Sequence, residues 1–148
     1  MNPDQVLLRS FKGEPLAIDS NPLAAALEAK LLALDAATGT VRLGFNPGPQ
    51  FVQGRGVVQG GIVGTMLDFA AAFAAVANLP EGQTAATATI TIAFHSGVRA
   101  GPLIAVGTVE RAGKRLMFTR AQLQNVDGQT LAVANAVMSV LADAPPMA

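Results

Sequence analysis

The stretch Gly60–Ala77, GGIVGTMLDFAAAFAAVA, decides the fold. Its larger apolar side chains fall all round a helical wheel, and alanines fill the gaps between them. A helix that is apolar on every side must be buried on every side, so this stretch predicts the central helix of the domain. It also reaches the lower length limit for crossing a bilayer. Asp68 near its middle would cost roughly 2.5–3.5 kcal/mol in a membrane, so we do not expect a membrane span.

Extended segments flank this helix on both sides. Before it, residues 29–35 and 40–45 are joined by a Thr38-Gly39 turn and predict a hairpin, because apolar side chains alternate in the second segment. After it come four extended segments whose joints carry glycine turn signals, which predicts an antiparallel meander in which neighbouring strands pair. These segments are 84–94, 102–111, 115–125 and 130–141.

The order of these elements predicts an α+β fold, in which a curved antiparallel sheet wraps around a central long helix. An N-terminal arm, residues 1–28, precedes the hairpin, and the N-cap signal Asn21-Pro22 predicts a short helix within it. In the segment 84–94, Thr87, Thr89 and Thr91 alternate with apolar residues. Strand periodicity then predicts one face lined by hydroxyls, which could line a cleft.

Composition narrows the possible functions. The chain has 148 residues with 51% hydrophobic and 14% charged content, which predicts one domain over residues 1–148. Ten basic and ten acidic residues give no net charge, so a nucleic acid partner is not expected. There is no cysteine and a single histidine, which argues against thiolate and histidine-cluster metal sites; no metal or redox cofactor is expected. The N-terminal residues lack the pattern of a signal peptide, so we expect a cytoplasmic location.

Asp68 is the only acidic residue between Asp35 and Glu81. Burying an ionised carboxylate without partners is costly, so Asp68 must face water in a cleft or be held by hydrogen bonds. Either arrangement suits a functional site, although Asp68 could equally occupy a solvated stripe of the helix or serve a structural role.

The residues Gln59-Gly60-Gly61 come directly before and at the start of the helix. Glycines there allow a substrate to approach the unpaired N–H groups of the first turn, which together with the helix dipole can hold an oxyanion. Taken alone, a glycine pair between a loop and a helix is also ordinary turn chemistry.

The chain resembles the hotdog-fold acyl-CoA thioesterases, particularly the 4-hydroxybenzoyl-CoA thioesterase-like branch related to phenylacetic acid degradation. The resemblance covers roughly residues 29–141. The pattern of that family is Asn, two residues, Gly, two residues, His-Gly-Gly, and an acidic residue eight positions after the first of these glycines. Here Gln53, Gly56, Gln59, Gly60 and Gly61 fill the pattern, and Asp68 stands at the acidic position.

The resemblance implies a role for each matching residue. Asp68 would be the catalytic carboxylate, acting as nucleophile or as general base toward water. Gly60 would offer its N–H to the thioester oxygen, and Gln53, where many members carry Asn, would position water or the carbonyl. Thr87 falls where members place a Ser or Thr that reaches across a dimer interface to the cleft of the acidic residue. Gly61 would help to bind the substrate.

Gln59 departs from the family pattern, because most members have histidine at this position. An amide can donate a hydrogen bond but cannot titrate near neutral pH, so proton transfer would fall to Asp68 and water. A thiol with a pKa of about 8.5 leaves as a thiolate with little acid assistance, so hydrolysis stays plausible. His95 is interpreted as a strand-end residue without a catalytic task.

Basic residues cluster around two turns, and a nucleotide with phosphates could use some of them, Arg115 in particular, although solvated turns carry such residues too. They are Arg99, Arg111, Lys114, Arg115 and Arg120.

The leading hypothesis is a thioesterase for a small or medium acyl-CoA, aromatic acyl groups included, with coenzyme A entering as part of the substrate. One alternative is a binder of acyl-CoA that does not hydrolyse it. A hotdog-fold dehydratase or hydratase is the third, and the absence of a histidine near the helix argues against it. The resemblance also implies a homodimer or homotetramer, in keeping with the need to cover an apolar edge strand.

Overall fold

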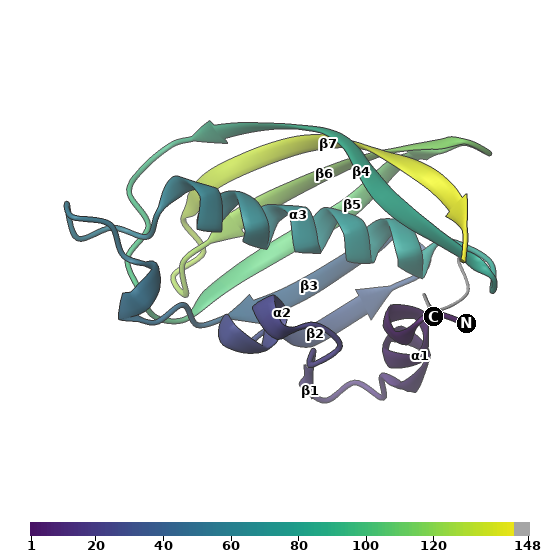
Figure 1. The fold of residues 1–148 in the computed structure, drawn as a ribbon, viewed down its shortest axis with the longest axis horizontal. Helices are drawn as coiled ribbons and strands as arrows, with labels where there is room; N and C mark the ends of the chain where they lie inside the picture. Colours follow the sequence, from purple (N-terminus) through teal and green to yellow (C-terminus); the bar gives the residue numbers. More distant parts are fainter. Residues whose placement is uncertain (144–148) are drawn as a thin grey trace, which may run out of the picture.

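Helix α3 has the bounds that the sequence predicts, Gly60–Ala77. In the computed structural model, which describes residues 1–143, α3 lies in the concave face of one seven-stranded antiparallel sheet (Figure 1). The predicted α+β architecture, a curved sheet around a central helix, is therefore confirmed. Residues 144–148, which the predicted domain includes, lie outside the described residues.

The helices and strands have the following order and bounds along the chain. They are α1 (Pro3–Ser10), β1 (Leu16–Ala17), α2 (Pro22–Ala26), β2 (Lys30–Asp35), β3 (Thr40–Phe45), the 3-10 turn η1 (Pro49–Phe51), α3, β4 (Gln83–Phe94), β5 (Leu103–Ala112), β6 (Leu116–Gln124) and β7 (Thr130–Ala142).

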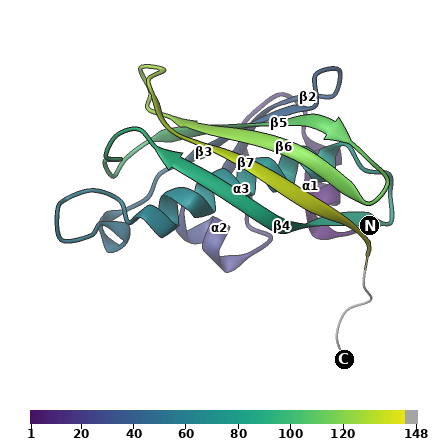
Figure 2. The same cartoon turned by 90° about the horizontal axis from the view of Figure 1, so that it is seen from above.

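The sheet order is β1-β2-β3-β5-β6-β7-β4, so the predicted meander is only partly correct. Strands β5, β6 and β7 do form it through the predicted turns, but β4 pairs with β7 and lies at the edge of the sheet (Figure 2). The reason lies in residues 95–102, which form a long connection rather than a tight turn. The N–H of Val58 donates to the carbonyl of Val98 (2.7 Å), so this connection is attached to the loop before α3 and carries the chain across to β5.

A β-bulge in β4 overturns the prediction that its three threonines share a face. Thr87 pairs with Met138 and Thr89 with Val137, so Ala88 is the extra residue in the ladder. Because side chains alternate along a strand, one inserted residue reverses the faces that follow. Thr87 therefore points toward α3, and the two later threonines line the outer face of the sheet.

The N-terminal arm contains a helix that the sequence analysis missed. Helix α1 begins after Asn2, whose side chain accepts from the N–H of Gln5 (2.9 Å), and Pro3 occupies its first turn. Asn21 caps the predicted helix α2 in the same way. Leu27, directly after α2, is fully buried in the main core, as is Ile18 between the two helices. The arm is thus part of the core.

The centre of the core is the contact between α3 and the sheet. Alanines and a few large side chains of α3 are buried there, and β5 approaches the helix closely at Gly107. A Cβ added at Gly107 would lie 2.1 Å from the carbonyl oxygen of Ala70, so only glycine fits. By length and hydropathy alone α3 could also cross a membrane. In the structure, however, α3 packs in the concave face of the sheet (Figure 1).

Candidate active site

The N-terminus of α3 presents unpaired backbone donors. Gln59 is the N-cap residue, and its carbonyl accepts from the N–H groups of Ile62 (2.9 Å) and Val63 (3.1 Å). The N–H groups of Gly60 and Gly61 donate to no carbonyl or side chain within residues 1–143. Two free donors at the positive end of a helix dipole form a ready site for an oxyanion.

A cavity of about 400 Å³ opens at this end of α3, and we call it the helix-end cavity. Its walls come from the loop before α3, the first turn of α3, the end of β4 and the connection after β4. Most of its side chains are apolar, which suits the burial of an acyl group. The lining residues are Gln53, Val57, Val58, Gly60, Val63, Phe94, His95, Ser96, Gly97 and Val98.

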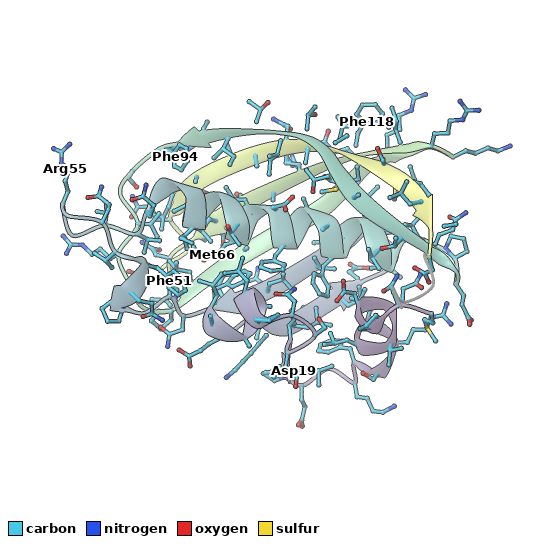
Figure 3. The ribbon with its side chains drawn as sticks, viewed as in Figure 1. Asp19, Phe51, Arg55, Met66, Phe94 and Phe118 are labelled. Atoms are coloured by element: carbon cyan, nitrogen blue, oxygen red, sulfur yellow. The ribbon has the colours of Figure 1, made fainter. Side chains whose placement is uncertain are left out.

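The cavity brings together Gln53 and Gly60, as the family pattern implies, and adds two residues that the sequence analysis did not place there. Phe94 lies against Gly60, because a Cβ added to that glycine would be 3.6 Å from two ring atoms (Figure 3). His95, which we interpreted as lying outside the site, lines the same cavity. For Phe94, the sequence signal was the alternation of side chains along β4, a strand that packs over the helix. For His95, the sequence carried no such signal.

Gln53 is held by its own turn. Its side-chain oxygen accepts from the N–H of Arg55, and its backbone N–H donates to the carbonyl of Val57 (2.8 Å). This fixes the amide orientation, so the side-chain NH₂ group is left to donate to a ligand in the cavity. Arg55 itself stands at the exposed tip of the loop (Figure 3).

Asp68 lies two turns further along α3, beneath β4. The hydroxyl of Thr87 donates to its Oδ1 at 2.6 Å, and Asp68 is half-buried with no ion-pair partner within residues 1–143. The resemblance implied that Thr87 would reach a carboxylate across a dimer interface. Here the contact is made within one chain, because the bulge turns Thr87 toward its own helix.

One chain does not bring Asp68 and Gly60 to the same reacting group. Eight residues of α-helix span about 12 Å along the axis, which exceeds the reach of a single thioester carbonyl. Asp68 also does not line the helix-end cavity. A single chain therefore holds a carboxylate and an oxyanion site at separate places on one helix.

Arg115 lies away from both places in the single chain. It precedes β6, whose first residue Leu116 pairs with Ser139 near the end of β7. That part of β7 pairs with the beginning of β4, whereas Phe94 beside Gly60 is at the opposite end of β4. The structure thus separates Arg115 from the helix-end cavity by the length of the sheet.

Gly61 and Gln59 are both exposed at the start of α3. In the described part of the chain, the side chain of Gln59 makes no capping hydrogen bond, and a Cβ added at Gly61 would meet no heavy atom within 4 Å. Within residues 1–143, no three His, Asp or Glu side chains group in a way that could hold a metal ion.

Comparison with known proteins identifies the family. The model of the thioesterase superfamily matches residues 55–132, which include the end of the loop before α3, α3 itself, strands β4 to β6 and the first residues of β7. No curated protein sequence matches the chain. Because more than half of the chain is matched, this protein belongs to the thioesterase superfamily and is a thioester hydrolase.

Solved structures agree with this assignment. A putative thioesterase of Ralstonia eutropha JMP134, a phenylacetic acid degradation-related protein, is 27% identical over 93% of this chain and 99% of its own, with a TM-score of 0.80. A Bacillus halodurans protein solved with CoA is 27% identical over 68% of this chain and 66% of its own, with a TM-score of 0.65. The PaaI protein of the Escherichia coli phenylacetic acid degradation operon shares the fold, at 22% identity, 83% and 86% coverage and a TM-score of 0.75. The predicted hotdog fold is confirmed.

Proposed function

We propose that this protein hydrolyses acyl-CoA thioesters with small or medium acyl groups, aromatic ones included. The observation that carries the proposal is the pair of N–H groups of Gly60 and Gly61, which donate to no acceptor within residues 1–143, together with the largely apolar cavity that Gly60 lines. An apolar acyl group would fill the cavity while its carbonyl oxygen accepts from Gly60. Such donors stabilise the negative oxygen that develops when the carbonyl is attacked.

Asp68 supplies the carboxylate of this mechanism. As a general base it takes a proton from water while the oxygen of that water bonds to the thioester carbon, giving a tetrahedral oxyanion. Collapse of the oxyanion breaks the C–S bond and releases the thiolate of CoA and the carboxylic acid. As a nucleophile, Asp68 would instead form a mixed anhydride with the acyl group, which water then cleaves. Neither route needs a metal or a redox cofactor.

The separation of Asp68 from Gly60 supports a site shared between two chains. Among residues 1–143, strand β4 is an edge strand with one side unpaired, which favours pairing with a second copy. A two-fold axis beside Gly64, midway between the two residues, would place Asp68 of one protomer opposite Gly60 of the other. We therefore propose a homodimer as the smallest active unit. A homotetramer would contain two such dimers, each with Asp68 of one protomer opposite Gly60 of the other.

Thiol release from a panel of acyl-CoAs tests this function. The panel contains phenylacetyl, hydroxybenzoyl and straight-chain examples, and wild type is compared with Asp68→Asn. We expect the variant to lose at least 100-fold in kcat, because the amide can neither accept a proton nor attack. Asp19→Asn, an exposed carboxylate on the N-terminal arm, is the matched control and keeps wild-type activity. Equal activity of wild type and Asp68→Asn would contradict the mechanism.

The exposed amide of Gln59 favours one second candidate, an acyl-CoA binder that does not hydrolyse its ligand, because the site lacks the usual titratable group at this position. A binder would show a rise in melting temperature with acyl-CoA and no thiol release. Gain of turnover in Gln59→His would then indicate an intact pocket. Thiol release by wild type rejects the binder.

A further inference from the structure

His95 is the only histidine in the chain, and it directly follows Phe94, the last residue of β4. Its backbone N–H donates to the carbonyl of Leu131 on β7 (2.9 Å), so the backbone of His95 is held against the neighbouring strand. The residue lines the helix-end cavity together with Gly60. The proposed mechanism gives His95 no task.

His95 belongs to the rim of the helix-end cavity. The floor consists of buried valines from the loop before α3, from α3 and from the connection after β4, namely Val58, Val63 and Val98. His95 and its neighbour Phe94 line the same cavity and are exposed. An acyl group that fills the cavity down to its floor therefore leaves its thioester group at the rim.

The sulfur of the substrate must also lie at this rim. In the proposed function the carbonyl oxygen accepts from the N–H of Gly60, and the sulfur is bonded to the same carbon as that oxygen. The coenzyme is long and polar, so it continues from the sulfur toward solvent. The sulfur thus stands between the buried valines and the exposed side chains, where His95 is.

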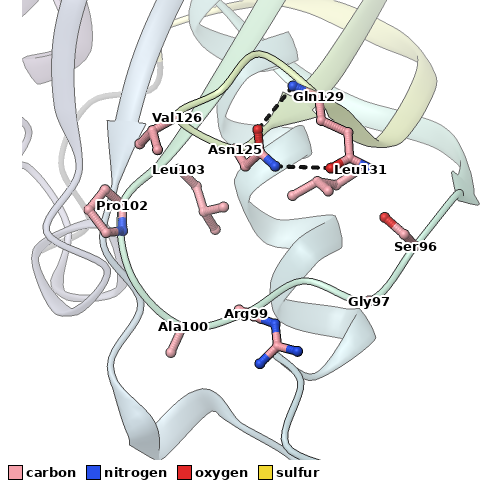
Figure 4. Close-up of a pocket in the computed structure, with 10 residues that line it drawn as sticks. All are labelled: Ser96, Gly97, Arg99, Ala100, Pro102, Leu103, Asn125, Val126, Gln129 and Leu131. Carbon is pink, nitrogen blue, oxygen red and sulfur yellow. Dashed lines mark hydrogen bonds between the residues drawn. The ribbon is translucent and has the colours of Figure 1, made fainter.

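His95 is the one residue of the cavity wall that can give a proton near neutral pH. Within residues 1–143 no Asp, Glu, Lys or Arg lines the cavity, and the amide of Gln53 and the hydroxyl of Ser96 keep their protons. Two arginines are near in the chain, Arg55 at the loop tip (Figure 3) and Arg99 further along the connection (Figure 4). A guanidinium is not deprotonated in proteins. An imidazole gains and loses its proton in this pH range.

Resting on the proposed function, we propose that His95 is the general acid and supplies the titratable group that Gln59 lacks. As the C–S bond of the tetrahedral oxyanion breaks, its electron pair goes to sulfur, and the imidazolium of His95 gives its proton to that sulfur. CoA then leaves as the thiol, and the carbonyl re-forms as the carboxylic acid. Asp68 holds the proton taken from water. Asp68 then releases this proton to solvent, and His95 takes one up.

Leaving groups of different basicity test this proposal. A CoA thiolate gains from a proton, whereas 4-nitrothiophenolate, a much weaker base, leaves without one. In His95→Gln we expect kcat to fall about tenfold for the acyl-CoA that wild type cleaves fastest, below the usual range for general acid catalysis because a thiolate is already a fair leaving group. For the 4-nitrothiophenyl thioester of the same acid, kcat should stay at the wild-type value. Arg42→Gln, exposed on β3 and outside the cavity wall, is the matched control and changes neither.

The pH dependence of kcat gives a second readout with the same acyl-CoA. Wild type should lose about tenfold on the alkaline side, because the imidazolium of His95 loses its proton, and should fall to the level of His95→Gln. The variant should show no such alkaline loss. Both proteins keep the acidic loss that comes from protonation of Asp68. Profiles of the same shape in the two proteins overturn the proposal.

The outcomes separate this proposal from the proposed function. An equal fall for both thioesters in His95→Gln, or no fall for either, overturns the role of His95 while hydrolysis by wild type stands. If wild type cleaves the acyl-CoA and leaves the 4-nitrothiophenyl thioester intact, the two pH profiles decide. If wild type cleaves no thioester, the proposed function fails, and the role of His95 fails with it.

Discussion

The hydroxyl of Thr87 donates a hydrogen bond to Oδ1 of Asp68 at 2.6 Å, between the edge strand and the central helix. The β-bulge at Ala88 makes this contact possible, because it lets Thr87 face the helix while Thr89 faces outward. The Oγ1 atom of Thr87 also lies 3.5 Å from the sulfur of Met138, the residue that pairs with Thr87 on β7. The hydrogen bond from Thr87 orients Oδ1 of Asp68 and leaves Oδ2 available to act as general base or nucleophile.

Removing the hydroxyl should therefore affect the reaction more than the fold. In Thr87→Val, which keeps the shape of the side chain, we expect kcat to fall about tenfold with KM nearly unchanged, since one hydrogen bond to a charged group is lost. Thr87→Ser should restore most of the activity. Thr89→Val is the matched control, because the same change occurs on the outer face of the same strand. Equal losses in the two valine variants would show that Thr87 acts only through strand stability.

The close approach of β5 to α3 at Gly107 gives a prediction on stability. Gly107→Ala would place a methyl group 2.1 Å from the carbonyl oxygen of Ala70, so β5 and α3 must separate. We expect a loss of about 3 kcal/mol or more in the free energy of unfolding, at or beyond the usual range for overpacking. Urea denaturation measures it. Gly54→Ala, with open space around its α-carbon and no positive φ, should change stability by less than about 0.5 kcal/mol.

The sequence predicts the helix and strands well because their signals are local. The bounds of α3 follow from an apolar stretch that stops before Asn78, whose side chain then donates to the carbonyl of Ala74 (2.8 Å). Helix α1 was missed although Asn2-Pro3 repeats the signal of Asn21-Pro22. The N-cap signal of α1 was therefore present in the sequence, and the sequence analysis overlooked it.

The place of β4 and the meeting of Thr87 with Asp68 depend on non-local contacts. The sequence of residues 95–102 does not indicate that the carbonyl of Val98 accepts a hydrogen bond from the loop before α3. This hydrogen bond accompanies the crossing of the chain from β4 to β5. A bulge is likewise invisible to a period-two pattern, because the alternation of Thr87, Thr89 and Thr91 is regular in the sequence. The motif spacing placed Gly60 and Asp68 on one helix, but it could not show that they stay about 12 Å apart in one chain.

Phe94 should control which acyl groups are accepted. Its ring lies against Gly60, whose N–H is the proposed oxyanion donor, and 55% of the residue is exposed. Phe94→Ala enlarges the helix-end cavity beside that donor, so we expect relative kcat/KM to shift at least tenfold toward larger acyl groups in a panel from acetyl-CoA to phenylacetyl-CoA. Phe118→Ala removes a ring of similar exposure, 42%, from the outer face of the sheet and should leave the ranking unchanged. A parallel change in both variants, or a change in oligomeric state confined to Phe94→Ala, would assign Phe94 to stability or assembly instead of acyl selection.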